Sequence, residues 1–377
     1  MNARAAERPR LTPTIEFFGS SGDYAELGPE IDGRVRTVLA SGQVLQGAAV
    51  ARFEERVAEA AGRRHAVAVG SGTDALFFAL RAAGIGTGDE VLVPSVTFVA
   101  SASAIVRTGA KPVFVDMAQL SEINLAAAAR LVSPHTRALV HVHLFGGMND
   151  PRPIENFVER HGLLLIEDFA QSFGASYSGR RAGSLGFAGA TSFDPTKVIG
   201  APGSGGALVT DDEEVAAKAR RLRLHGKSGA QFAELGYNSQ LATVGAAILD
   251  LKVDYHKQWT NRRRDVAERY VGGLRGLPVQ FWPSDARTDH VWHKFVLLTD
   301  HRDALAAFLE HQGIPTRVHY ERPLHREPLF AATQTDEEFP NAMEYCRRTL
   351  SLPIHSHLSR EAVEHVIAGV HSFFSLH

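Results

Sequence analysis

Short apolar runs alternate with amphipathic segments from about residue 51 to residue 168, and this alternation constrains the fold more than any other feature. Runs such as HAVAV (65–69) and EVLVP (90–94) predict strands, and a segment such as ARFEERVAEAA (51–61) predicts a helix. Because strands that alternate with helices form βαβ units, the strands should run parallel, with helices on both faces of the sheet. The sequence therefore predicts an α/β fold.

The pattern changes farther along the chain. Residues 190–193 and 205–210 are too close together in the chain for a helix to lie between them, so they predict a pair of antiparallel strands. A long helix is expected near 240–272. The later elements are expected to be strands over 290–298 and 314–320, and helices over 301–313, 341–350 and 360–374. We therefore divide the chain into an N-terminal arm (1–25), a large domain with a mostly parallel sheet covered by helices (26–255), and a smaller C-terminal α+β domain (256–377).

The composition is that of an ordinary globular protein. Among the 377 residues, 40 Lys and Arg stand against 42 Asp and Glu, so no broad positive field is available to hold nucleic acid or an anionic membrane. The sequence contains no apolar run of about 18 residues that would span a membrane, and the start lacks the apolar segment of a secretory signal. The single cysteine, Cys346, excludes an internal disulfide. We expect a cytoplasmic protein.

The segment GSGTDAL (70–76) lies between a predicted strand and a predicted helix, and its residues suit phosphate binding. Gly70 and Gly72 allow close backbone approach, and Ser71 and Thr73 offer hydroxyls beside the free N–H groups of a helix N-terminus. The segment matches neither G-x-G-x-x-G nor the Walker A pattern, which disfavours a dinucleotide or a nucleoside triphosphate. By itself such a segment is more often a glycine turn with a helix cap.

Asp168 ends the apolar run LLLIED (163–168), and Lys197 stands in a Gly- and Pro-rich loop between two short predicted strands. Open α/β sheets bind ligands at the carboxyl ends of their strands, which is where Asp168 is expected, although a helix cap would also explain it. A lone lysine in a loop is most often a solvated surface charge. The catalytic alternative is a Schiff-base lysine, whose amine is activated by desolvation or by a nearby cation.

The three features together indicate pyridoxal phosphate. The helix N-terminus would hold the phosphate, Asp168 would keep the pyridine nitrogen protonated, and Lys197 would form the Schiff base with the aldehyde. No single feature carries this prediction, because each has an ordinary structural explanation. Their combination in this chain order on an α/β scaffold favours the cofactor.

Further motifs follow one another in a fixed order along the chain. They are SGTDAL (71–76), GDEVLVPSVTFVASASAI (88–105), GAKPVFVDM (109–117), EDFAQSFGA (167–175), RAGSLGFAGATSFDPTK (181–197), GGALVT (205–210), GYNSQ (236–240) and VHYERPLH (318–325). In this order the chain resembles the sugar-nucleotide aminotransferases of the DegT/StrS group, which are fold-type-I pyridoxal-phosphate enzymes. The resemblance extends from about residue 41 to residue 355.

The resemblance implies a role for each matching residue. Lys197 would be the Schiff-base lysine and proton shuttle, and Asp168 would pair with the pyridine nitrogen. The implied cofactor contacts are Gln171 beside the 3-hydroxyl, Phe98 on the face of the ring, Gly72, Thr73 and Ser192 at the phosphate, and Asn238 reaching the phosphate from the partner subunit of a homodimer. The residues implied near the substrate entrance are His319, Tyr320 and His325.

The resemblance also implies a reaction, namely transfer of an amino group from an amino acid such as L-glutamate to a keto sugar linked to a nucleoside diphosphate. The acceptor could instead be a keto-cyclitol. Two other classes remain to be weighed, an NAD-dependent sugar-nucleotide enzyme and a non-catalytic regulator on the same scaffold. Some relatives carry His at the lysine position and dehydrate sugars, and Lys197 argues against that activity here.

Two positions depart from the family pattern. The stretch after the lysine usually contains Gly-Glu-Gly-Gly and here contains APGSGG (201–206), and Asn238 is followed by Ser-Gln where Tyr-Arg is common. These departures concern substrate contacts rather than the cofactor. The eighteen histidines include His141 and His143 on one face of a predicted strand, but no third ligand is in view, so we expect structural roles and no metal.

Overall fold

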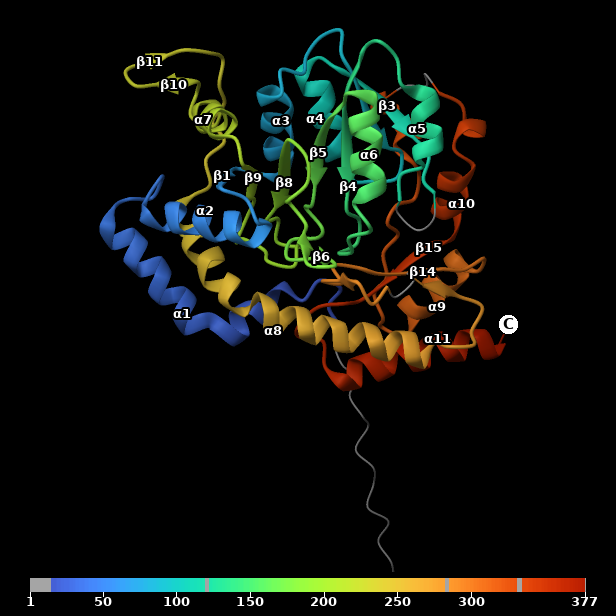
Figure 1. The fold of residues 1–377 in the computed structure, drawn as a ribbon. Coiled ribbons are helices and arrows are strands. Elements are labelled where there is room, and N and C mark those ends of the chain that lie inside the picture. Colours follow the sequence, from blue (N-terminus) through green and yellow to red (C-terminus); the bar gives the residue numbers. More distant parts are fainter. Residues whose placement is uncertain (1–14, 119–121, 282–284, 331–333, 377) are drawn as a thin grey trace, which may run out of the picture.

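A seven-stranded sheet forms the centre of the molecule (Figure 1). The computed structural model describes residues 15–118, 122–281, 285–330 and 334–376. In spatial order the strands are β1 (His65–Val69), β9 (Gly206–Thr210), β8 (Ala188–Ser192), β5 (Leu164–Asp168), β4 (Thr136–Val142), β2 (Glu90–Pro94) and β3 (Lys111–Val115). The neighbours from β8 to β3 are parallel, whereas β9 is antiparallel to both β1 and β8. The expected mostly parallel sheet and its antiparallel pair are both confirmed.

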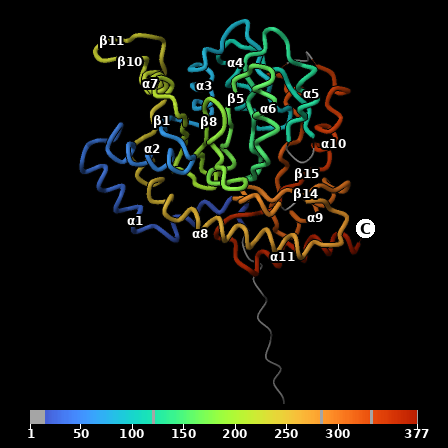
Figure 2. The backbone as a smooth tube through the Cα atoms, in the orientation of Figure 1, coloured from blue at the N-terminus to red at the C-terminus, as the bar shows by residue number. Residues whose placement is uncertain are grey.

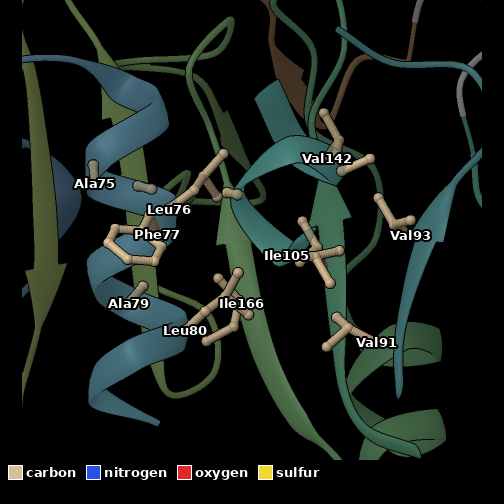
Figure 3. Close-up of a cluster of buried hydrophobic side chains, with 14 of the residues drawn as sticks. Ala75, Leu76, Phe77, Ala79, Leu80, Val91, Val93, Ile105, Val142 and Ile166 are labelled. Atoms are coloured by element: carbon tan, nitrogen blue, oxygen red, sulfur yellow. The ribbon is translucent and has the colours of Figure 1, made fainter. Parts of the chain in front are cut away.

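Helices cover both faces of this sheet because its strands are apolar on both sides. One face packs against α3 (Gly72–Ala82), α4 (Ala100–Thr108) and α7 (Glu213–Leu222), and the other against α2 (Ala48–Ala61), α5 (Leu125–Leu131), α6 (Arg152–His161) and the start of α8 (Thr243–Gly273). Successive strand residues face opposite sides, so Ile166 belongs to the first core and Leu165 to the second. Figure 3 shows Ile166 beside Leu80 of α3 in the first core.

A smaller antiparallel part lies at the C-terminal end. Its three-stranded sheet consists of β12 (Gln280–Phe281), β14 (Phe295–Leu298) and β15 (Thr349–Leu352), and its helices are α9 (Arg302–His311), α10 (Pro340–Arg348) and α11 (Arg360–Leu376). The remaining short elements are β6 (Ser176–Tyr177), β7 (Arg180–Arg181), β10 (Lys227–Ser228), β11 (Gln231–Phe232), β13 (Thr288–Asp289), η1 (Leu324–Arg326), η2 (Pro328–Phe330) and η3 (Asp336–Glu338). No helix within the described ranges is long and apolar enough to cross a membrane.

The helix α8 links the two parts. It is continuous over 31 residues, and it contacts α2 near its start and α11 near its end (Figure 1). The expected boundary at residue 255 therefore falls inside one helix.

The N-terminal region differs from the arm expected over residues 1–25. Residues 1–14 lie outside the described part, and residues 20–25 already belong to α1 (Ser20–Ser41), which packs along α8 (Figure 2). Leu27 and Ile31 are buried there against Trp259. Gly22, Gly28, Pro29 and Gly33 interrupt the apolar pattern of α1, so the sequence of this segment does not indicate a helix.

Two sequence-based assignments in the C-terminal part are wrong. Residues 314–320 form no strand and make only an isolated bridge between Arg317 and Ser351, because the place beside β14 is taken by β15. Residues 349 and 350, expected to end the helix over 341–350, instead begin that strand. Of the strand expected over 290–298, only 295–298 is observed.

Candidate functional site

A cavity of about 350 Å³ opens at the carboxyl ends of the parallel strands. It lies where the end of β5, the N-terminus of α3 and the loop 193–205 come together, as expected for an open α/β sheet. The sequence-predicted residues that line it are Gly72, Thr73, Phe98, Asp168, Gln171, Ser192, Lys197, His319 and Tyr320. Segments far apart in the sequence thus meet at one site.

The N-terminus of α3 lies unusually close to the end of β8. A Cβ atom added to Gly72 would lie 2.7 Å from the Cβ of Ser192, so only glycine fits there. The hydroxyl of Ser71 accepts a hydrogen bond from the N–H of Asp74 at 3.1 Å and caps the helix. The first N–H groups of a helix have no partner within it, and here they border a cavity that Thr73 and Ser192 also line. This arrangement suits a phosphate group.

Asp168 is a buried carboxylate held by two donors. Ser101 donates to its Oδ2 at 2.8 Å, and the N–H of Ala170 donates to its Oδ1 at 3.1 Å. Burial raises the pKa of Asp168 above its ordinary value, and these two hydrogen bonds oppose that effect. A buried carboxylate is stabilised by a cation, and a protonated ring nitrogen bound in the cavity would supply one.

Lys197 lies in the cavity wall, in a turn fixed by the hydrogen bond from its N–H to the carbonyl of Asp194. Burial lowers the pKa of Lys197, while the charges of Asp168 and Asp194 raise it. A depressed pKa leaves more of the amine unprotonated, and this is the form that attacks a carbonyl carbon. Lys197 is therefore a cavity residue rather than a solvated surface charge.

Gln171 and Tyr320 are held in place by each other and by the backbone. The N–H of Phe145 donates to Oε1 of Gln171 at 3.0 Å, and Nε2 of Gln171 donates to the hydroxyl of Tyr320 at 3.1 Å. Phe98 is 53% exposed although it lines the cavity, so it is not a core residue. An accessible aromatic face in a cavity suits stacking against a flat ring.

The segment 290–294 enters the site because it is not a strand. It wraps around Gly146, since the N–H of Val291 donates to the carbonyl of Gly146 and the N–H of Lys294 to that of Phe145. His293 and Lys294 consequently line the cavity, together with Phe18 from the N-terminal segment. Sequence reasoning missed these three residues, and the only available signal was a lysine and a histidine within an apolar run.

Two predicted site residues do not line the cavity. His325 is buried elsewhere, with its ring 3.9 Å from the ring of Phe339 and its Nε2 3.2 Å from Oδ1 of Asp336. Asn238 lies outside the cavity and its backbone bridges to Leu224. The expected place of His325 near the substrate entrance is therefore not observed, and a contact from Asn238 would have to reach a second subunit.

Glu167 and His143 are buried in the protein interior, and His141 is half-buried beside them. Glu167 is fully buried, accepts hydrogen bonds from the N–H groups of Gly183 and Leu185 at 2.7 Å each, and lies 2.8 Å from Nε2 of His143. Burial holds the pKa of His141 well below its ordinary value. Among the residues that the structure describes, no three His, Cys, Asp or Glu side chains gather as a metal site would need.

Comparison with known proteins gives a family match over residues 25–371, described as the DegT/DnrJ/EryC1/StrS aminotransferase family. The chain is 41% identical to a dTDP-3-amino-3,4,6-trideoxy-alpha-D-glucose transaminase of Streptomyces venezuelae, over 95% of this chain and 96% of that protein. It is also 40% identical to a protein of Geobacillus stearothermophilus named pleiotropic regulatory protein, over 96% of this chain and 98% of that one.

Solved structures resemble this fold over nearly the whole chain. The crystal structure of S. venezuelae DesV in complex with a ketimine intermediate has a TM-score of 0.92 and 39% identity, covering 96% of this chain and 98% of that one. The structure of NtdA from Bacillus subtilis, with bound cofactor PMP, has a TM-score of 0.87 and 26% identity, covering 98% of this chain and 87% of that one.

Proposed function

The chain belongs to the DegT/DnrJ/EryC1/StrS family of pyridoxal-phosphate-dependent aminotransferases, and from this premise we propose that it aminates a keto sugar linked to a nucleoside diphosphate. The amino donor is an α-amino acid such as L-glutamate. The observation that carries the proposal is the meeting of Lys197, Asp168 and the glycine-built N-terminus of α3 at one cavity. The S. venezuelae relative, named for a dTDP-linked amino sugar, supports this acceptor class.

Each residue has a task in this proposal. Pyridoxal phosphate, when bound, supplies an aldehyde for the amine and a ring that accepts electrons. Lys197 holds the cofactor and moves a proton at the reacting carbon, while Asp168, kept in position by Ser101, holds the proton on the ring nitrogen. Gln171 would contact the ring hydroxyl, and Phe98 would stack on the ring. Gly72, Thr73 and Ser192 bind the phosphate.

The active site in this proposal is shared between two subunits. Asn238 from one subunit contacts the phosphate held by the other. Support comes from three exposed apolar side chains, Leu45, Phe232 and Leu235. Phe232 and Leu235 are close to Asn238 in the chain, and Leu45 forms a backbone bridge with Ala242. A partner subunit would cover these side chains. We also propose a cytoplasmic location, in keeping with the biosynthetic role of such enzymes.

The alternative functions are less well supported. An NAD-dependent enzyme is excluded by the family. A keto-cyclitol acceptor stays possible on the same chemistry, because the cofactor residues do not distinguish the two acceptors. The name of the G. stearothermophilus relative suggests a regulator for that protein. A regulator without activity has no need of a lysine and an aspartate that line one cavity.

The test is to prepare the pyridoxamine form of the enzyme and to mix it with a panel of nucleotide-linked keto sugars and keto-cyclitols. A productive acceptor should restore the yellow colour of the pyridoxal form within one turnover. If only keto-cyclitols restore the colour, the nucleotide-sugar proposal is wrong.

A further inference from the structure

Lys294 is a second lysine in the wall of the cavity, and the proposed reaction leaves it without a task. It is 6% exposed and belongs to the segment that wraps around Gly146. Its Nζ lies 4.1 Å from the centre of the Phe18 ring and 5.5 Å from that of Phe17. These rings attract the ammonium group and fix its position beside the cavity.

The surroundings of Lys294 contain more positive than negative charge. Within the described part of the chain its Nζ forms no hydrogen bond or ion pair with a carboxylate. The charged groups that act on it are Lys197, Arg263 and Arg317, with Asp194 as the opposing anion. Burial and these cations hold the pKa of Lys294 well below its ordinary value. A buried ammonium group in such surroundings is stabilised by an anionic ligand.

The phosphate of the cofactor is not the anion expected at Lys294. The N-terminus of α3 and Ser192 already suit that phosphate, and they belong to other elements than Lys294. A second anion must then come from a substrate. Lys197 marks the position of the reacting carbon, and its charge is close enough to influence the pKa of Lys294. In an α-amino acid the carboxylate is bonded directly to the reacting carbon.

We propose that Lys294 binds the α-carboxylate of the amino donor, which deepens the proposed function and rests on it. The ammonium group of Lys294 donates hydrogen bonds to the carboxylate and orients the donor so that its Cα lies next to Lys197. Phe17 and Phe18 cover the ammonium from the N-terminal side and hold it at the site. A sugar acid as acceptor would present the same chemical group, so the test must separate the two sources.

The experiment compares Lys294→Met, Lys294→Arg and the wild type as holoenzymes. Single-turnover loss of the yellow colour with L-glutamate gives the dissociation constant of the donor. The same measurement with an amino sugar product, which has no α-carboxylate, tests the other half-reaction. We expect Lys294→Met to weaken glutamate binding by about 10- to 100-fold, Lys294→Arg to restore part of it, and the amino sugar to bind as before. Lys257→Met, at an exposed position, is the matched control.

Other outcomes would overturn the assignment. Unchanged glutamate binding in Lys294→Met, or equal weakening of glutamate and the amino sugar, means that Lys294 is not the carboxylate ligand. Weakening confined to an acceptor that carries a carboxylate moves the subsite from donor to acceptor and refutes the donor assignment.

Calorimetric titration with glutarate, a dicarboxylate that cannot react, separates this inference from the proposed function. If the wild type binds glutarate and Lys294→Met does not, the carboxylate site stands even when no keto sugar is aminated. If glutarate binds equally to both enzymes, the inference fails even when transamination is observed.

Discussion

The hydroxyl of Ser101 donates a 2.8 Å hydrogen bond to Oδ2 of Asp168, so a residue of α4 holds the carboxylate at the end of β5. Both side chains are buried, and a third residue, Thr97, lies 3.2 Å from the Ser101 hydroxyl. The hydrogen bond stabilises the charged form of Asp168 against the cost of burial. A residue of a neighbouring helix therefore helps to maintain the charge that, in the proposed function, pairs with the ring nitrogen.

Replacing Ser101 with Ala should lower kcat/KM by about tenfold, because a hydrogen bond to a buried charged group typically contributes about 1.5–3 kcal/mol and part of the loss is recovered by water. The pKa of Asp168 should rise further, which weakens its hold on the ring proton. Steady-state kinetics on the holoenzyme measure the effect. Ser103→Ala, on the same helix but bonded only to the carbonyl of Ala100, should change kcat/KM little. Equal losses in both variants would contradict this role of Ser101.

A mixture of Lys197→Ala and Asn238→Ala subunits should regain activity that neither variant has alone. A hybrid dimer would contain one site with both substitutions and one site with neither, because Asn238 is proposed to serve the cofactor of the partner subunit. After random exchange, about a quarter of the sites should be intact. Activity measured after mild dissociation and remixing checks this. If mixing restores nothing while Asn238→Ala alone is inactive, Asn238 does not act across the interface.

The free energy of unfolding should fall as the pH is lowered from 7 toward 4. His355 is buried, its Nε2 lies 3.2 Å from the carbonyl of Glu16, and its Nδ1 accepts from the N–H of His357. Burial lowers the pKa of His355 to about 4. The unfolded chain binds a proton at higher pH than the folded chain, so stability is full above the ordinary pKa of histidine and is lost below it. The contribution of His355 is up to roughly 3 kcal/mol.

Denaturant unfolding at several pH values measures this dependence. His355→Gln should show a shallower decline between pH 7 and pH 4 than the wild type, and His135→Gln, at an exposed position, should follow the wild type. Identical declines in all three proteins would show that the burial of His355 does not contribute.

Replacing Tyr320 with Phe should weaken the positioning of Gln171. The Tyr320 hydroxyl accepts a hydrogen bond from Nε2 of Gln171, and the half-buried Tyr320 lines the cavity. Loss of this neutral hydrogen bond should reduce kcat/KM by about three- to tenfold and leave the protein folded. The absorption maximum of the bound cofactor should shift, because Gln171 is proposed to lie beside the ring hydroxyl. An unchanged spectrum together with unchanged kinetics would refute this arrangement.

The central sheet could be predicted from the sequence because each strand and helix carries its own local pattern. Strands β1 and β2 coincide with the apolar runs HAVAV and EVLVP. The helix α1 was missed because its glycines and Pro29 interrupt the apolar periodicity of a helix. Its apolar residues are buried only by packing against α8. Residues 349 and 350 were assigned to the end of a helix because they follow α10 directly, and pairing with β14 makes them part of a strand.

Most site residues that belong to sequence motifs could be predicted. Residues that reach the cavity only through the folding of the chain could not. Lys197 and Asp168 stand in distinctive local contexts, and the structure places both at one cavity. Lys294 and Phe18 carry no such context, since they reach the cavity through a loop around Gly146 and through the N-terminal segment. His325 is an exception, since it ends the motif VHYERPLH, yet it lies in the 3-10 helix η1 and packs against Phe339.

The most direct test of the account is to identify the lysine that binds pyridoxal phosphate. The purified protein is incubated with pyridoxal phosphate, reduced with borohydride, digested, and mapped by mass spectrometry. The account predicts a yellow protein and a pyridoxyl adduct on Lys197, with none on Lys294 and none in Lys197→Ala. A protein that stays colourless, or an adduct that forms on another lysine while Lys197 stays unmodified, would contradict it.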